Sequence, residues 1–391
     1  MINGLFVPTG NSGINYWRMH NFYNSGYRQG IMNFPVIWWQ KDLYEVHPWE
    51  RDVHQTEHFW RITKELQDWA VQAEIIVFGM LHGPGVSVLS EKSNAVSDYL
   101  TNSMAMFMAI KDMFPNKPIL TEIDDDMLST PPYNPAAPFY VPEGILRKLV
   151  LMQMKESDGV ITSTPRLAEI YSDFNTNIHV IPNAIDFKVW DKAKNARKLG
   201  KKGIRIGWAG GANHEDDLKI MEKVIPAITA KHKNVEFTFV HGCPHYLRDI
   251  PGVTYKSPWT SIDKYPKMLA QQNFDIGIAP LIDNAFNRGK SNLRWLEYSA
   301  LGIPTVASNV GNFKETLNHG KDGLLADNAE EFIAHLAWLI GDRTFRRQMG
   351  LNAWERVRKD FNVDKVTDTY AQVLEREIEK KNATKEAEVL V

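Results

Sequence analysis

The segment from Arg288 to Ser308 combines an amphipathic helical pattern with a Gly-Ile-Pro turn and a short apolar run. At 100° per residue, Lys290, Arg294 and Glu297 fall in one sector of the predicted helix, about 60° wide. A neighbouring sector is apolar and contains Leu293, Leu296 and Ala300. The turn ends the helix, and the run after it is typical of a buried strand in a parallel sheet. This order predicts an α/β fold with charged side chains beside the strand ends, where such sheets bind ligands.

The three charges on this face have two interpretations. Arg294 and Glu297 have the i,i+3 spacing of a surface ion pair, which stabilises a helix by only about 0.3 kcal/mol. Alternatively, two cations and one carboxylate suit a ligand with phosphates at one end and vicinal hydroxyls at the other. A sugar nucleotide carries both kinds of group. The position of the helix, directly before a predicted core strand, favours the second interpretation.

Length and composition set the outer limits. A chain of 391 residues is long enough for two domains, and its formal net charge of −2 provides no basic excess for nucleic acid, which is therefore not favoured as a partner. The single cysteine, Cys243, excludes an internal disulfide and fits a reducing compartment. The N-terminal residues lack a signal-peptide pattern, and the sequence contains no apolar run of membrane-spanning length. We therefore expect a cytoplasmic protein without a transmembrane segment.

Apolar runs alternate with helical patterns along the chain, which predicts two doubly wound units built on parallel sheets. The expected domains are 1–186 and 204–360, joined by a polar, lysine-rich linker at 187–203, with a C-terminal helix and frayed tail at 361–391. Helices are expected at Glu57–Gln72 and Ser93–Met113, among others. The predicted strands are Leu5–Pro8, Val36–Trp39, Ile75–Met80, Pro118–Ile123, Gly159–Thr162, His179–Ile181, Ile204–Trp208, Glu236–His241, Val253–Lys256, Asp275–Ala279, Thr305–Ala307 and Gly323–Leu325.

Several motifs of the second half occur together, in a fixed order, over about 150 residues. They are IGWAGG at 206–211, DIGIAP at 275–280, Lys290-Ser291 leading to EYSALGIP at 297–304, and GKDGLL at 320–325. In this order they resemble the nucleotide-binding domain of the GT-B glycosyltransferases, especially the retaining group called family 4. The segment VIPNAID at 180–186 is similar to that family's interdomain crossing. The resemblance implies an α/β protein of GT-B fold, with two Rossmann-like, doubly wound parallel-sheet domains facing a cleft.

The resemblance also assigns donor-binding residues. Glu297 matches the second glutamate of the family's Glu-x7-Glu motif, which accepts hydrogen bonds from both ribose hydroxyls of the donor, whereas Gly289 stands where the first glutamate is expected. The family's arginine and lysine near the first turn are missing as well. Lys290 is therefore the expected replacement for the phosphate clamp, and Arg294 either contacts the diphosphate or pairs with Glu297. The remaining expected donor contacts are Gly13, Gly210, Gly211, Asn213 and Ser291.

Candidate residues near the reacting sugar lie in the first half. Asp124 and Asp125 end an apolar strand, where the family carries a His-Asp pair, and His82 follows another strand. Two other interpretations apply to the acidic run: Asp124 and Asp126 have the spacing of the metal-binding D-x-D of GT-A enzymes, or the acids are solvated loop residues. The second half already resembles a metal-independent nucleotide domain, which favours the first interpretation and a site without metal.

The predicted activity is transfer of a sugar from a UDP-, GDP- or ADP-sugar to a hydroxyl acceptor, with no cofactor or metal required. The resemblance implies retention of anomeric configuration. The acceptor is a glycan, a lipid, a protein or a modified base, and the residues do not choose among these. Two other functions stay open at this point: a sugar-nucleotide epimerase of GT-B shape, with acid and base groups at Asp124, Asp125 and His82, and a binding protein without turnover.

Overall fold

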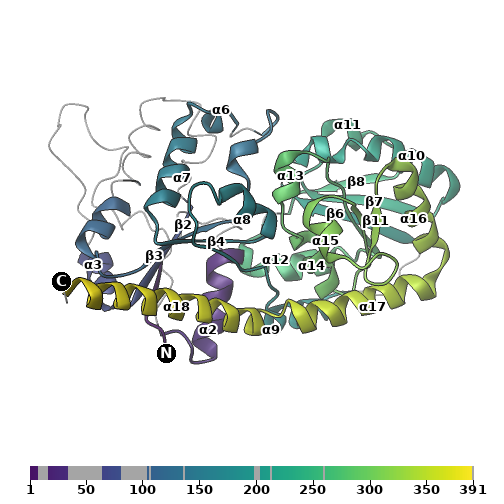
Figure 1. The fold of residues 1–391 in the computed structure, drawn as a ribbon. Coiled ribbons are helices and arrows are strands. Elements are labelled where there is room, and N and C mark those ends of the chain that lie inside the picture. Colours follow the sequence, from purple (N-terminus) through teal and green to yellow (C-terminus); the bar gives the residue numbers. More distant parts are fainter. Residues whose placement is uncertain are drawn as a thin grey trace. The chain divides into compact units, whose positions relative to one another are not determined.

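The computed structural model of the chain describes residues 1–7, 16–33, 64–80, 104, 107–134, 137–197, 203–211, 214–258 and 260–389. The polypeptide divides into two compact units. Unit 1 consists of Met1–Pro182 and Asp364–Val391, and unit 2 consists of Asn183–Val363. Each unit has its own parallel sheet, and the two are described separately below (Figure 1).

Unit 1 is built on a five-stranded sheet in the order β1-β2-β3-β4-β5, with every described pair parallel. The first four strands are buried along their whole length, as expected for a parallel sheet with both faces covered. The strands are β1 (Gly4–Val7), β2 (Ile75–Gly79), β3 (Ile119–Ile123), β4 (Gly159–Thr162) and β5 (Ile178–Val180).

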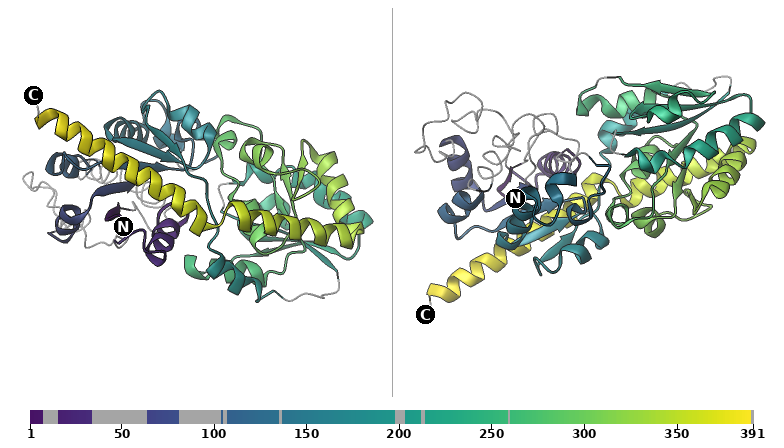
Figure 2. Two further views of the ribbon diagram at one scale, coloured as in Figure 1. Left: turned by 60° about the horizontal axis from the view of Figure 1, so that its bottom comes forward. Right: turned by 90° about the horizontal axis from the view of Figure 1, so that it is seen from above.

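The helices of unit 1 come from both ends of the chain. The long helix α18 (Val363–Val389) contributes from Asp364 onward, and Figure 2 shows it running along this unit. The other helical segments are the π-helix η1 (Tyr16–His20), α2 (Asn21–Arg28), α3 (Lys64–Gln72), the 3₁₀ turn η3 (Met127–Ser129), α6 (Ala137–Tyr140), α7 (Ile145–Glu156) and α8 (Pro165–Tyr171).

A buried polar cluster fastens α18 to the sheet of unit 1. Glu122, on β3, accepts a hydrogen bond from Arg18 Nε at 2.7 Å and another from Tyr370 OH at 3.0 Å. All three residues are at most 3 % exposed. Nearby, the Asp364 carboxylate accepts hydrogen bonds from Ser25 at 2.6 Å and from Arg28 at 3.2 Å. The C-terminal helix is therefore part of the core of unit 1 and not an appendage to it.

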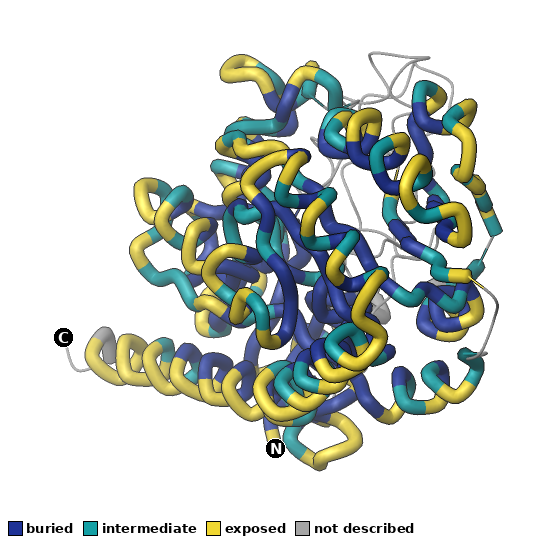
Figure 3. The backbone as a smooth tube through the Cα atoms, turned by 90° about the vertical axis from the view of Figure 1, so that its right-hand side faces the viewer, coloured by how far each residue is buried: buried dark blue, intermediate teal, exposed yellow. Residues whose placement is uncertain are grey.

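Unit 2 is a doubly wound α/β domain. Its six strands are all parallel and follow the order β11-β10-β9-β6-β7-β8, so the chain reverses direction across the sheet between β6 and β9. Figure 3 shows buried strands beneath helices that are exposed on their outer side. The strands are β6 (Ile204–Gly210), β7 (Val235–His241), β8 (Val253–Lys256), β9 (Ile276–Ala279), β10 (Thr305–Ser308) and β11 (Leu324–Ala326).

The helices of unit 2 cover this sheet with apolar faces. One core cluster joins the strands to helices α10 and α16 through residues such as Val224, Phe237 and Phe332. The helical segments are α9 (Phe187–Lys194), the 3₁₀ turn η5 (Asp216–Leu218), α10 (Met221–Lys231), α11 (His245–Arg248), η6 (Ile262–Lys264), α12 (Tyr265–Gln271), α13 (Ala285–Gly289), α14 (Leu293–Ala300), α15 (Gly311–Thr316), α16 (Ala329–Gly341) and α17 (Arg343–Asp360).

The structure confirms the predicted α/β class and nearly all of the predicted strands, each within two residues at either end. The strand expected at Val36–Trp39 lies outside the described residues, as do parts of the helices expected at Glu57–Gln72 and Ser93–Met113. One segment differs from its expectation. Residues 187–203 were expected to form a linker, but Phe187–Lys194 form α9 and belong to unit 2, because Phe187, Trp190 and Ala193 bury an apolar face.

Candidate functional site

The strand order of unit 2 reverses between β6 and β9, and we call the region at the carboxyl ends of these two strands the crevice of unit 2. These two strands pair only at Ile206↔Ile276 and Gly207↔Gly277, although β6 continues to Gly210. Beyond this point α14 supplies the hydrogen bonds that a strand would have made. Tyr298 OH accepts from the Ala209 N–H at 3.0 Å, and Arg294 Nε donates to the Ala209 carbonyl at 3.0 Å. The backbone of β6 is thus held apart from β9 at the position where open α/β sheets bind ligands.

Two glycines make room for these side chains. A Cβ atom at Gly210 would clash with Nη2 of Arg294, and one at Gly277 would clash with the ring of Tyr298. Tyr298 is fully buried, so its ring has no space into which to retreat. The glycines of this region are therefore explained by the close approach of α14 to the sheet.

A methyl group at position 277 is consequently expected to destabilise unit 2. Because overpacking a core costs about 1–3 kcal/mol, Gly277→Ala should lower the melting temperature by several degrees in thermal unfolding. Gly341→Ala, at the end of α16, is the matched control, since a Cβ there meets no atom within 4 Å. Equal melting temperatures for the two variants would contradict this account of the crevice.

Arg294 contacts the carboxyl-terminal half of β6. Besides holding Ala209, its guanidinium stacks over the ring of Trp208 at 4.8 Å from the centroid. Its described contacts do not include an ion pair with Glu297, so the interpretation of this face as a surface salt bridge is wrong. The charge of Arg294 nevertheless reaches Glu297 and lowers the pKa of that carboxyl, against the larger opposite effect of burial.

Lys290 and Ser291 precede α14 and are not on its face, which corrects the predicted geometry. The structure places a separate short helix, α13, at Ala285–Gly289, and Lys290 is its C-cap residue with extended backbone. Only then does α14 begin, at Leu293. The Lys290 ammonium lies over the Phe286 ring at 4.4 Å, and Ser291 Oγ accepts a hydrogen bond from Asn183 Nδ2 at 2.9 Å. Lys290 therefore lies in the loop between α13 and α14.

Glu297 is the buried carboxylate of the site. It is 6 % exposed, and its Oε2 accepts a hydrogen bond from Tyr265 OH at 3.2 Å. Burial raises the pKa of Glu297 to about 7, although Arg294 and the Tyr265 hydroxyl each act to lower it. Burial disfavours the ionised form of this carboxyl group. Any further hydrogen-bond donor therefore stabilises it, because hydrogen bonds to the charged form favour ionisation. The residue is suited to accept hydrogen bonds from hydroxyl groups of a ligand.

Gly210 and Gly211 form the turn at the carboxyl end of β6. Gly211 is exposed, and the carbonyl groups of both residues lie against Gly242, where a Cβ would come within 2.7 Å of the Gly211 oxygen and 3.0 Å of the Gly210 oxygen. His241, before Gly242, has φ of 69°, a conformation that L residues seldom adopt. The ends of β6 and β7 are thus packed backbone to backbone, which leaves little side-chain bulk around this turn.

A histidine-aspartate pair that the sequence analysis did not identify stands next to this turn. His214 Nδ1 lies 2.8 Å from Asp217 Oδ2, and the other oxygen of Asp217 accepts from Ile282 N at 2.9 Å and Asn287 Nδ2 at 2.7 Å. The i,i+3 spacing of the pair was visible in the sequence. Its significance was not, because Ile282 and Asn287 reach Asp217 only through the tertiary fold.

In unit 1, the acidic run follows β3 as predicted. Asp124 and Asp125 are partly exposed at the carboxyl end of this strand. Asp126 is 1 % exposed, and its carboxylate accepts hydrogen bonds from the amides of Leu128 and Ser129 at the start of η3, so it is not the solvated loop residue of one interpretation. Among the described residues, no group of three or more histidine, cysteine, aspartate or glutamate side chains has the arrangement of a metal site. The remaining predicted site residues, Gly13, His82 and Asn213, lie outside the described residues.

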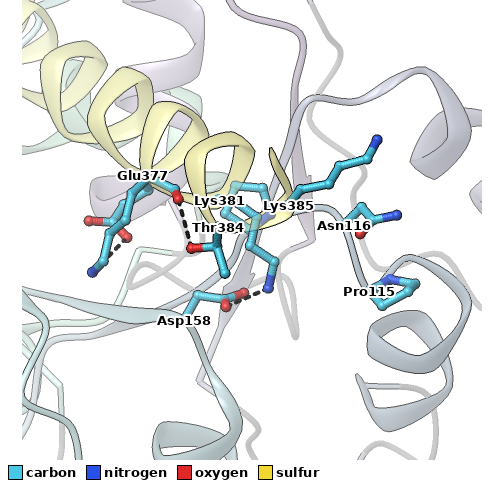
Figure 4. Close-up of a pocket in the computed structure, with 9 residues that line it drawn as sticks. Pro115, Asn116, Asp158, Glu377, Lys381, Thr384 and Lys385 are labelled. Atoms are coloured by element: carbon cyan, nitrogen blue, oxygen red, sulfur yellow. Dashed lines mark hydrogen bonds and ion pairs between the residues drawn. The ribbon is translucent and has the colours of Figure 1, made fainter. Parts of the chain in front are cut away.

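A pocket of about 200 Å³ lies elsewhere on unit 1 (Figure 4). Pro118 and Asp158, which precede β3 and β4, place it at the amino edge of the sheet, opposite to the edge that carries Asp124 and Asp125. Its other wall is the end of α18, where Lys381 pairs with Asp158 at 2.7 Å.

No helix within the described ranges is long and apolar enough to span a membrane.

Comparison with known proteins agrees with this architecture. Residues 222–372 match the glycosyl transferase-like family. A 73-residue segment is 32 % identical to the trehalose synthase of Pyrococcus horikoshii and covers 19 % of this chain and 18 % of that protein. The match thus spans less than a fifth of the length of this relative.

Solved structures match over nearly the whole chain. Anabaena HepE in complex with UDP superposes with a TM-score of 0.60 at 15 % identity, covering 95 % of this chain and 99 % of HepE. The UDP-glucose complex of HepE has a TM-score of 0.61 at 15 % identity over 96 % and 100 % of the two chains. Sucrose-phosphate synthase from Thermosynechococcus elongatus has a TM-score of 0.59 at 14 % identity over 95 % and 98 %. These likenesses confirm the predicted GT-B fold, and the family match supports a glycosyltransferase.

Proposed function

We propose that this chain, a GT-B protein with a glycosyl transferase-like segment, transfers a sugar from a nucleoside diphosphate donor to a hydroxyl acceptor with retention of configuration. The donor occupies the crevice of unit 2 between β6 and β9. The observation that carries the proposal is the buried carboxylate of Glu297, three residues after Arg294 on α14, with Lys290 in the loop that precedes this helix. A nucleoside diphosphate offers ribose hydroxyls to the first and phosphates to the others.

In the proposed mechanism, Glu297 accepts hydrogen bonds from the ribose hydroxyls, and the turn Gly210-Gly211 lets backbone N–H groups approach the diphosphate. Positive charge at Lys290 stabilises the negative charge that develops on the diphosphate as its bond to the sugar breaks. Turnover on this proposal does not depend on an added metal. Ser291 and Asn213 are the other proposed donor contacts in unit 2. Gly13, as a donor contact, and His82, Asp124 and Asp125, as sugar-contacting residues, remain proposals on the basis of sequence alone.

The relatives suggest which donors to test first. HepE binds UDP and UDP-glucose, so UDP-sugars lead the panel, followed by GDP- and ADP-sugars. Each is incubated with the protein, with and without EDTA, and the products are separated by chromatography. Release of nucleoside diphosphate is expected and is insensitive to EDTA. An isomeric sugar nucleotide would instead indicate an epimerase, and binding without any product would indicate a protein that has lost turnover.

The role of Lys290 is tested by removing its charge. Lys290→Ala is expected to weaken UDP binding about tenfold in calorimetric titration, the effect of losing one charge-assisted contact to phosphate. Arg288→Ala is the matched control, because Arg288 is two residues away, exposed, and paired with Asp283 at 2.6 Å. Its affinity for UDP should change less than twofold. If Lys290→Ala bound UDP as tightly as the wild type, Lys290 would not be the replacement for the missing phosphate clamp.

A further inference from the structure

The pair His214–Asp217 has a defined protonation pattern. Carboxylate oxygens only accept hydrogen bonds, so the contact of 2.8 Å to Asp217 Oδ2 places a proton on Nδ1 of His214. The same carboxylate is fixed by donors from Ile282 and Asn287, which anchors it to the loop after β9 and to α13. In the neutral ring Nε2 then carries no proton. The imidazole is therefore held in one tautomer by a buried carboxylate that cannot turn away.

The surroundings of His214 keep the ring neutral before a ligand binds. Three charged groups act on it: Asp217 from η5, Lys290 from the C-cap of α13, and Arg294 from α14. Burial, together with the two cations, lowers the pKa of His214 to about 4 against the opposite effect of Asp217. The ring packs edge-on against Trp208, whose face carries the guanidinium of Arg294. His214 and Arg294 thus both contact Trp208, and Lys290 is close enough for its charge to act on the ring.

A diphosphate bound in this crevice changes the balance of charges that act on the His214 ring. Its negative charges cancel the repulsion that Lys290 and Arg294 exert on a protonated ring, while the attraction of Asp217 remains. A phosphate oxygen also offers an acceptor, and a charged N–H donor forms a strong hydrogen bond to it. Both changes favour the imidazolium form of His214.

Resting on the proposed function, we infer that His214 is a further donor-contacting residue, whose Nε2 takes a proton from solvent as the diphosphate binds and donates a hydrogen bond to it. No covalent bond forms or breaks, and one proton moves from water to the ring. Asp217 is a positioning residue, because it acts on the ligand only through His214. The pair thereby supplies the second positive charge that the turn Gly210-Gly211 lacks in its own sequence.

The test observes the ring directly. Protein labelled with ¹⁵N-histidine is titrated with UDP, GDP and ADP at pH 7.5, and long-range ¹H–¹⁵N spectra report the tautomer and charge of each of the 12 histidines. The signals of His214 are assigned by their absence in His214→Asn. They should change from a neutral ring protonated at Nδ1 to an imidazolium at saturation. Unchanged His214 signals with bound nucleotide would overturn the inference and leave the proposed function intact. Failure of all three nucleotides to bind would overturn both.

The variant also separates a charge effect from a structural one. The side-chain amide of asparagine can replace Nδ1 as donor to Asp217 but has no group at the position of Nε2, so His214→Asn should fold normally. We expect it to bind UDP about tenfold more weakly than the wild type at pH 7.5. The two proteins should converge in affinity by pH 9.5, where protonation of the wild-type ring becomes unfavourable. A deficit that is equal at both pH values would indicate a merely structural role.

Discussion

Glu297→Gln is expected to weaken UDP binding about 100-fold, the largest functional effect among the substitutions considered. Glu297 is nearly buried and retains a hydrogen bond from Tyr265, which glutamine can also accept. What glutamine removes is the negative charge offered to the ribose hydroxyls. Hydrogen bonds to charged groups contribute about 1.5–3 kcal/mol, and 2.7 kcal/mol corresponds to about 100-fold in affinity. Calorimetric titration with UDP at pH 8 measures this difference.

The same carboxylate predicts how binding depends on pH. Since burial raises the pKa of Glu297 to about 7, the group is mostly protonated at pH 6 and mostly ionised at pH 8. Ribose hydroxyls bind the ionised form, so the UDP affinity of the wild type relative to that of Glu297→Gln should rise about tenfold across that range. Proton uptake by His214 acts in the opposite direction in both proteins and cancels in this ratio. In Glu297→Gln this contribution disappears. Glu222→Gln, an exposed position on α10, is the matched control and should keep the wild-type pH profile.

The contribution of Glu297 to the stability of the fold should fall as pH rises, whereas its contribution to UDP affinity should increase. The folded-state pKa of Glu297 lies above its unfolded value of 4.5, so the stability associated with this group is fully present below pH 4.5 and lost as pH rises through about 7. At pH 8 the ionised carboxylate is held in a site that disfavours it. Thermal unfolding at pH 8 should therefore show Glu297→Gln to be at least as stable as the wild type. A variant that lost both stability and UDP binding would indicate a general disruption of the crevice and not a ligand contact.

Glu122→Leu is expected to give the largest loss of stability, about 3–5 kcal/mol. The substitution leaves the guanidinium of Arg18, 1 % exposed, without its carboxylate partner, and it removes the acceptor of Tyr370 OH. A single charge left in a buried site is strongly destabilising. For a unit of this size the loss corresponds to a fall of about 10 °C in melting temperature. Glu143→Leu is the control, because Glu143 pairs with Lys148 at an exposed site where ion pairs contribute little.

A double variant identifies the cause of this loss. If the uncompensated charge is responsible, Arg18→Met combined with Glu122→Leu should be more stable than Glu122→Leu alone, since both charges are then absent. Adding the first substitution should recover at least about 1 kcal/mol in thermal unfolding. A double variant less stable than either single variant would show that packing, and not charge, accounts for the effect.

The strands were predictable because parallel strands covered on both faces are apolar along their length. Ile75–Gly79 and Ile276–Ala279, for example, are continuous apolar or glycine runs, each preceded by an acidic residue. The segment 187–203 was harder, because its lysines suggested a linker while Phe187 and Trp190 bury one face of α9. The lysines lie on the exposed side of this helix, whereas the spacing of the apolar residues indicates the buried side, which determines the fold.

The candidate site was predictable in composition but not in geometry. Glu297 and Arg294 are on α14 as expected, yet Lys290 is not, because the chain breaks between α13 and α14 at 290–292. Asn284, three residues before Asn287, was the signal for the extra helix: its side chain accepts from the Asn287 amide as an N-cap. The hydroxyl of Tyr298 and the carboxylate of Asp217 act on backbone groups 65 to 91 positions away, which periodicity does not reveal.

The attachment of α18 to unit 1 has a consequence for synthesis. Unit 2 is one continuous stretch, Asn183–Val363, so all of its strands have been translated before the last helix emerges from the ribosome. Unit 1 cannot be completed before α18 is made, because Tyr370 belongs to its core although its sheet comes from the first 182 residues. The sheet of unit 1 is therefore synthesised before unit 2, but the core of unit 1 is completed after it. Until translation reaches α18, Arg18 and Glu122 lack the cover that this helix gives, so the nascent N-terminal unit exposes charged groups that the complete unit buries.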